Sequence, residues 1–221
     1  MMNARTNHLC TAWCFAVILG SCSMDEMIPL EVRPGSLELI PGQSFQLTAT
    51  VNHAHYLSDD SWYATVLDDG YVTARKPGRT LISVQCGGQT AMVDVLVNAT
   101  CSFIPEMDCY IGQPYEMIAD SLPDPDGLVQ DDLNCYWFKS RGRYSITYGL
   151  FFDKDDDLGL IRAIYVLVPP CYGALLLEYL DERYSYVTTL DDARYYYNRR
   201  GQVKLRAEYL AYVGAYSVLY Y

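Results

Sequence analysis

Basic residues and histidines are scarce in this chain of 221 residues. Sixteen lysines and arginines stand against 27 aspartates and glutamates, so the formal net charge at pH 7 is −11. A nucleic-acid-binding protein needs a basic face for the phosphates, and we therefore expect no nucleic-acid partner. The last of the three histidines is His55, which excludes a Ser-His or Cys-His nucleophile pair from the C-terminal half.

Motifs of metal, phosphate and hydrolase chemistry are also missing. The sequence contains no G-x-S-x-G, H-E-x-x-H or P-loop pattern. Asp153, Asp155 and Asp157 have the spacing of a calcium loop, but the glycine and glutamate that such a loop requires are absent. His53 and His55 are interpreted as a solvated pair. We expect no catalytic residue, no metal and no cofactor.

The cysteines do not form a zinc pattern. Five of the eight lie beyond residue 22, and none of these belongs to a C-x₂-C pair. An odd number cannot pair completely. A Cys101–Cys109 bridge around a short loop is sterically allowed, and the alternative is that these thiols are buried as small hydrophobic groups.

No apolar run approaches the ~20 residues of a membrane-spanning helix, but a shorter one begins the chain. The segment "LCTAWCFAVIL" follows Arg5 and has the length of a signal-peptide core. It ends in Leu19-Gly20-Ser21-Cys22, which resembles the lipobox of bacterial lipoproteins. The alternative is an ordinary secretory signal with a chance cysteine.

The lipobox resemblance implies where the protein is located in the cell. Residues 1–21 would be a signal peptide, Cys22 the lipidated N-terminus, and residues 22–27 a tether, so the membrane is a partner through the lipid anchor. The acidic "SMDEM" that follows Cys22 resembles the surface-export signal of lipoproteins in anaerobic gut Gram-negative bacteria. We expect an outer-membrane lipoprotein on the extracellular or periplasmic side.

Residues 28–98 have the pattern of a small β-sandwich. In "QSFQLTATV", Phe45, Leu47, Ala49 and Val51 alternate with polar residues, which is typical of a half-buried strand. The segments "RTLISVQ" and "QTAMVDVLV" repeat this period of two, and Pro-Gly, Asp-Gly and Gly-Gly pairs separate the segments as turns. Short strands at such spacing favour a sandwich.

The same residues resemble a known family. "LEVRPGSLELIPGQSFQLTATV", "YATVLDDGYVTARKPGRTLISVQ" and "TAMVDVLV" are similar to bacterial Ig-like domains of group 2 (BIG2). The resemblance implies an Ig-like spacer or adhesive module without shared catalytic residues. Trp62 stands two residues before Ala64, closer than the family tryptophan, so the loop is shortened or the register differs. Whether Trp62 is a core residue stays open.

Residues 101–221 form a second module with an internal repeat. Eighteen of the 21 tyrosines lie beyond residue 100. Aligning Asp132 with Asp191 places "DLNCYWFKSRG" on "DDARYYYNRRG", and each copy shows a helical pattern followed by three strands. This predicts an α+β domain with a mainly antiparallel sheet and both helices on one face. It resembles, in topology alone, β-lactamase inhibitory protein, and nothing functional transfers.

Two functions follow from this multi-domain organisation, an all-β Ig-like sandwich followed by an α+β domain. The favoured hypothesis is a non-enzymatic, surface-exposed lipoprotein for binding or adhesion, in which the Ig-like module presents a domain that binds a protein or a glycan. The alternative is an accessory protein or enzyme of glycan uptake. A flat aromatic sheet face favours the first function, and a buried carboxylate pair in a deep cleft favours the second.

Strand alternation predicts an aromatic platform in the second module. On the strand around residues 203–209, alternate residues from Val203 face the helices, and the polar residues between them face outward. The repeat alignment pairs Trp137 with Tyr196, and both are expected to face outward. The alternative is that a tyrosine-rich strand simply covers its own sheet. The candidate ligand-binding residues are Trp137, Tyr196, Arg194, Arg206 and Lys204, with Lys139 nearby.

We predict that Cys22 carries the anchor. Cys22→Ala removes the thiol that accepts the lipid, so the protein is expected to move from the membrane fraction to the soluble fraction. Mass spectrometry of the native protein is expected to show an acylated N-terminal cysteine. A Cys22→Ala protein that stays in the membrane fraction refutes the lipobox interpretation.

Overall fold

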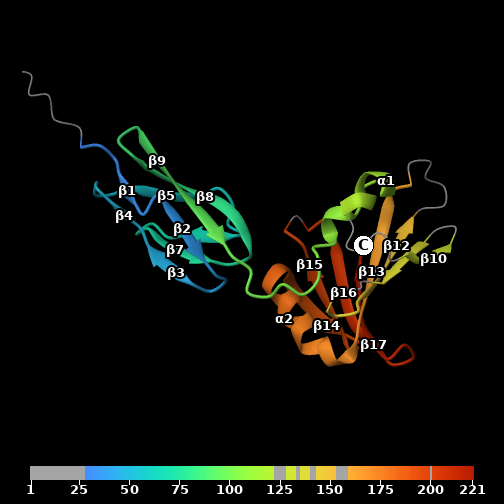
Figure 1. The fold of residues 1–221 in the computed structure, drawn as a ribbon. Helices are drawn as coiled ribbons and strands as arrows, with labels where there is room; N and C mark the ends of the chain where they lie inside the picture. The colour runs from blue at the N-terminus through green and yellow to red at the C-terminus, as the bar shows by residue number, and fades with distance from the viewer. Residues whose placement is uncertain (1–27, 122–127, 133–134, 140–142, 153–158, 200) are drawn as a thin grey trace, which may run out of the picture.

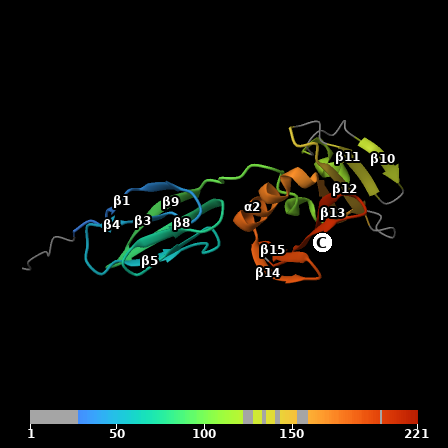
Figure 2. The same cartoon turned by 90° about the horizontal axis from the view of Figure 1, so that it is seen from below.

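The computed structural model describes residues 28–221 except 122–127, 133–134, 140–142, 153–158 and 200. The proposed signal peptide, Cys22 and the aspartates at 153–157 therefore lie outside the described residues. Within them the chain is mostly β-sheet, arranged as two modules joined by one connecting segment (Figures 1 and 2).

The first module is a sandwich of short strands. A sheet of order β2-β9-β8-β5 faces a sheet of order β3-β7-β6, and β1 pairs with β4 beside them. The strands are β1 (Val32–Arg33), β2 (Ser36–Leu39), β3 (Ser44–Gln46), β4 (Thr48–Ala49), β5 (His55–Ser58), β6 (Ala64–Val66), β7 (Tyr71–Ala74), β8 (Gly78–Cys86) and β9 (Gln89–Val97).

Alternation along the strands builds the core of this sandwich. Val93, Val95 and Val97 of β9 are all buried, as the sequence predicts. The prediction for "QSFQLTATV" is wrong in part, because the segment forms two short strands, β3 and β4, with Leu47 between them. Leu47 is buried, whereas Phe45 on β3 is 41% exposed. Trp62 is only partly buried and is not part of the core cluster.

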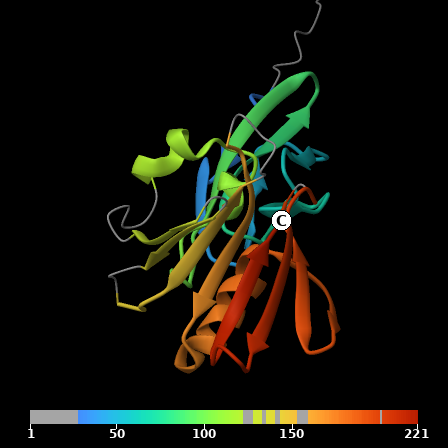
Figure 3. The same cartoon turned by 90° about the vertical axis from the view of Figure 1, so that its right-hand side faces the viewer.

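The second module contains one antiparallel sheet of eight strands in the order β10-β11-β12-β13-β17-β16-β15-β14 (Figure 3). The strands are β10 (Leu128–Asp132), β11 (Cys135–Lys139), β12 (Thr147–Phe152), β13 (Ile161–Val168), β14 (Ser185–Leu190), β15 (Ala193–Tyr197), β16 (Lys204–Leu210) and β17 (Ala215–Tyr220). The helices are α1 (Tyr115–Ile118) and α2 (Gly173–Arg183), with 3₁₀ turns η1 (Asp108–Tyr110), η2 (Ala119–Ser121) and η4 (Pro170–Tyr172).

The strand order shows how the two halves of the second module are assembled. Each half contributes a helix and four consecutive strands, and the two halves meet where β13 pairs with β17. The sequence predicts only three strands in each half, because β10 and β14 lack clear alternation. The two strands missed by sequence are the two edges of the sheet.

Both helices contribute to the core on one face of this sheet, which we call the inner face. Leu176 and Leu180 of α2 are fully buried there, and Ile118 of α1 belongs to the same cluster. Gly173 begins α2 where a Cβ atom would lie 2.2 Å from the ring of Tyr216, so the close approach of helix and sheet requires glycine. The opposite face is called the outer face.

The alternation gives a matched pair of stability predictions. Leu205→Ala removes a fully buried side chain from the inner face, and we expect a loss of about 2–5 kcal/mol in the free energy of unfolding. Lys204→Ala, at the neighbouring exposed residue, is expected to change it by less than about 0.5 kcal/mol. Urea denaturation measures both, and equal losses would contradict the assigned faces.

Candidate functional site

The prediction that Tyr196 faces outward is wrong. Tyr196 is fully buried on the inner face, where its hydroxyl donates a 2.9 Å hydrogen bond to Asp181 of α2. Arg194 lies on the same face and pairs with Asp181 at 3.8 Å. The polar character of Arg194 suggested an outward strand face, but the carboxylate on α2 provides a partner for it on the inner face.

The error comes from an offset of one position in the repeat alignment. Aligning Asp132 with Asp191 places Cys135, the first residue of β11, on Arg194, whereas β15 begins one position earlier, at Ala193. Both strands have the same sequence of buried and exposed positions. A shift of one position moves a side chain to the opposite face of a strand. The outward counterpart of Trp137 is therefore Tyr195, and the counterpart of Tyr196 is the buried Phe138.

Tyr195 and Trp137 belong to one row of side chains that crosses the outer face. Opposed residues on paired strands share a face, so the pairing register defines this row without gaps. We call it the outer row: Trp137, Gly149, Tyr165, Leu219, Arg206 and Tyr195. It spans five strand-to-strand steps, or about 24 Å.

Aromatic rings cluster at one end of the outer row. Trp137 lies over Gly149, where a Cβ atom would come within 2.9 Å of the indole. The Trp137 ring meets Phe151 edge-on at 5.7 Å between centroids, and Phe151 lies 5.3 Å from Tyr165. These three aromatic side chains are only partly buried, because they shield one another without a helix above them.

Charged residues lie beside the rings on this face. Arg206 donates a 2.7 Å hydrogen bond to Glu208 two residues along β16. Lys204 and Lys139 are exposed, at one end of β16 and β11 respectively. Of the predicted ligand-binding residues, the structure therefore places Trp137, Arg206 and Lys204 on one face, and Tyr196 and Arg194 on the other.

The inner face buries four tyrosines whose hydroxyl groups retain their protons at unusually high pH. Burial raises the pKa of Tyr196 to about 12, and it raises the pKa values of Tyr179, Tyr184 and Tyr220 well above the ordinary value of 10. Tyr184 donates a 3.0 Å hydrogen bond to Asp108. Of the four hydroxyls, that of Tyr196 joins the sheet to α2 through Asp181, and that of Tyr184 joins the end of α2 to η1 through Asp108.

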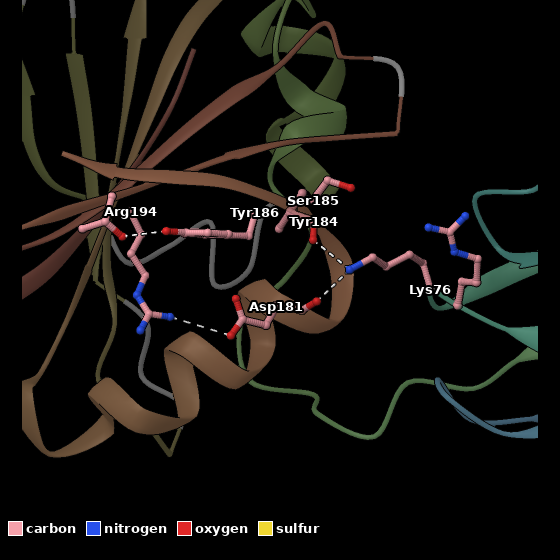
Figure 4. Close-up of a pocket in the computed structure, with 8 residues that line it drawn as sticks. Lys76, Asp181, Tyr184, Ser185, Tyr186 and Arg194 are labelled. Carbon is pink, nitrogen blue, oxygen red and sulfur yellow. Dashed lines mark hydrogen bonds and ion pairs between the residues drawn. The ribbon is translucent and has the colours of Figure 1, made fainter.

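A second candidate surface is the junction between the modules, where Lys76 contacts the end of α2. Its ammonium donates hydrogen bonds to the carbonyl oxygens of Asp181 at 2.7 Å and Tyr184 at 2.8 Å (Figure 4). The last carbonyls of a helix lack intrahelical partners, and a cation there also complements the helix dipole. Burial lowers the pKa of Lys76, and Asp181 opposes this shift.

Two further contacts join the modules. Arg199 forms an ion pair with Asp60, and its guanidinium lies 5.0 Å from the ring centroid of Tyr63. In the connecting segment, the backbone N–H groups of Thr100 and Cys101 donate to the carboxylate of Glu182 at 2.6 and 2.9 Å. The modules therefore share specific polar contacts besides their covalent link.

The Lys76 contact lies in an open cleft of about 590 Å³ between the modules, which we call the junction cleft. Figure 4 shows Lys76 approaching from the first module and Arg194 from the second, with Asp181 between them. Its lining residues are Arg75, Lys76, Asp181, Tyr184, Ser185, Tyr186, Thr189 and Arg194. The sequence did not reveal this cleft, because its residues are brought together only by the contact between modules.

The described cysteines form neither a disulfide nor, with neighbouring histidines and acids, a cluster that could hold a metal ion. Cys86, Cys101, Cys109, Cys135 and Cys171 form no disulfide with one another, so the described residues contain no Cys101–Cys109 bridge. No cluster of three or more His, Cys, Asp or Glu side chains among the described residues is arranged to hold a metal ion. In that same part of the chain, no helix has both the length and the apolar composition needed to cross a membrane.

Comparisons with known proteins give no family. No family model matches the chain, and no curated protein matches it. Solved structures with some similarity include an intimin mutant of EHEC O157:H7 (12% identity, TM-score 0.27, covering 82% of this chain and 86% of that one). Domains 5-6 of the S-layer protein SbsC have 12% identity and a TM-score of 0.28, covering 87% and 82% of the two chains. At TM-scores this low, neither likeness carries an argument about function.

The buried tyrosines predict a loss of stability in alkali. The pKa values of these tyrosines are raised in the folded state. Their contribution to the free energy of unfolding is therefore complete below about pH 10, and that of Tyr196 is lost as the pH rises toward 12. In this range, a tyrosine that is protonated in the folded protein is ionised in the unfolded chain. Each such tyrosine reduces the free energy of unfolding by about 1.4 kcal/mol for every pH unit.

Urea denaturation between pH 8 and pH 12 measures this slope. Tyr196→Phe is expected to make the slope shallower, and Tyr212→Phe, at a side chain that is 86% exposed, is the matched control. Folded protein whose buried tyrosines all ionise near pH 10, seen as tyrosinate absorbance, would contradict the prediction.

Proposed function

We propose that this protein is a non-enzymatic binding protein displayed on a bacterial surface. A lipid on Cys22 anchors it in the outer membrane, the acidic tether follows, and the first module is a BIG2-type Ig-like spacer. The second module presents its outer face to a protein or glycan ligand. The lipobox residues and the sequence pattern of residues 28–98 support the first two parts, and the outer face supports the third.

The observation that carries the proposal is the aromatic outer row. Large flat rings that lie beside an arginine and remain partly exposed are the side chains that contribute most at binding interfaces. Trp137 and Tyr195 stand near opposite ends of the row, with Arg206 next to Tyr195 in the register. A surface about 24 Å across is wide enough to contact either a folded protein or several sugar units.

The alternative, an accessory protein or enzyme of glycan uptake, requires acids in a concave site. Among the described residues the side chain of Glu182 is a buried carboxylate, but it already accepts hydrogen bonds from the backbone N–H groups of Thr100 and Cys101. Asp181 lines the junction cleft, but Tyr196 and Arg194 already engage it. The observed geometry therefore favours binding over hydrolysis.

We predict that ligand capture depends on the outer row. In a screen of host proteins and glycans, Trp137→Ala and Tyr195→Ala are each expected to weaken binding of the captured ligand about 10- to 30-fold, because each removes a stacking ring. Tyr212→Ala, at an exposed tyrosine of the β16–β17 turn, is the matched control. Surface plasmon resonance measures the affinity, and circular dichroism verifies the fold.

Unchanged affinity in both outer-row variants would refute the proposed surface. Release of reducing sugar from any glycan in the same screen would instead support the enzymatic alternative.

A further inference from the structure

The edge strand β14 lacks the charged residues and the proline that usually protect a sheet edge. It is last in the sheet order, and within the described part of the chain it pairs with β15 alone. Its sequence, "SYVTTL", contains neither a charged residue nor a proline. Tyr186, Val187 and Leu190 are 53%, 48% and 57% exposed. A free edge of this kind presents unpaired backbone groups to another chain.

The opposite edge differs. The sequence of β10 ends in Asp131 and Asp132, and acidic residues at an edge discourage strand pairing. The only irregularity in β14 is a bulge between Tyr186 and Thr188. One edge strand thus has two acidic residues in its sequence, and the other has no charged residue.

The junction cleft lies directly beside this neutral edge. Ser185, Tyr186 and Thr189 of β14 line it. So do three cations, Arg75, Lys76 and Arg194, against the single carboxylate of Asp181. In a chain with a net charge of −11, this local excess of positive charge complements an acidic group.

The three cations differ in how far they are already engaged. The ammonium of Lys76 donates to two helix carbonyls, and Arg194 pairs with Asp181. Arg75 is exposed, and its guanidinium donates a long hydrogen bond of 3.4 Å to the carbonyl of Ser61. Arg75 is therefore the cation most available to a ligand.

From the free edge and the adjacent charge, we infer that β14 binds an extended peptide of a partner protein as a ninth strand, with an Asp or Glu side chain in the junction cleft. Backbone hydrogen bonds along β14 supply affinity that does not depend on sequence, and the cleft selects the acidic side chain. Arg75 and Arg194 are its expected partners. This surface is separate from the outer row, so the inference does not rest on the proposed ligand of that face.

The test uses the full chain carrying Cys22→Ala, with a display library of random linear octapeptides as the probe. The expected result is enrichment of peptides that combine β-branched residues with one acid at a fixed position. The most enriched peptide is then synthesised together with its counterpart in which Gln or Asn replaces the acid. We expect the acidic peptide to bind at least fivefold more tightly than its amide counterpart.

Two variants separate the roles of the cleft and the edge. Arg75→Ala is expected to abolish the preference for acid over amide while leaving the affinity of the amide peptide within twofold. Arg33→Ala, at an exposed arginine of the same module, is the matched control. It is expected to change neither the preference for acid over amide nor the affinity of the amide peptide. Val187→Lys adds an edge charge at an exposed residue and is expected to weaken both peptides at least tenfold, with an unchanged melting temperature.

Several results would overturn the inference. The library could yield no enriched peptide, or the enriched peptides could lack an acid at a fixed position. Peptide binding that is unchanged in Val187→Lys would overturn it as well. Concentration-dependent dimerisation that Val187→Lys abolishes, measured by analytical ultracentrifugation, would assign the edge to a second copy of the chain instead. Outer-row variants are expected to bind the peptide as tightly as the parent protein does. This result distinguishes the test of the β14 edge from the test of the proposed function.

Discussion

The antiparallel pairing of β13 with β17 is the constraint on which the second module depends. Five residue pairs, from Ile164 with Tyr220 to Val168 with Tyr216, join the two halves of the repeat into one sheet. Because both halves are joined through their last strands, their helices contribute to the same face, and their first strands become the two edges. The aromatic outer row and the free β14 edge both follow from this single pairing.

Much of this arrangement is present in the sequence. Helical spacing from Gly173 onward and the period of two in β9, β13 and β16 correspond to elements of the structure. Where alternation is strong and one face is clearly apolar, burial on that face determines the register, and the pattern is sufficient.

Prediction from sequence failed where side-chain polarity and strand face disagree. Tyr196 and Arg194 lie on the inner face because Asp181 on α2 accepts the tyrosine hydroxyl and pairs with the guanidinium. Strand β14 was missed because an edge with exposed apolar residues has no clean alternation. The junction cleft depends on Lys76 meeting carbonyls of α2 that lie far along the chain, and no local pattern encodes such a contact.

The central position of β17 also governs how the second module folds. β17 follows every other strand of the sheet in the chain, yet it lies between β13 and β16. Until β17 is added, the first four strands have an open edge at β13, and Ile164 and Val166 lack the strand that flanks them in the finished sheet. Folding of this module therefore waits for pairs that are 48 to 56 residues apart in the chain, and such non-local pairing folds slowly and exposes unpaired strands to aggregation. The nascent chain carries this open edge until β17 is inserted.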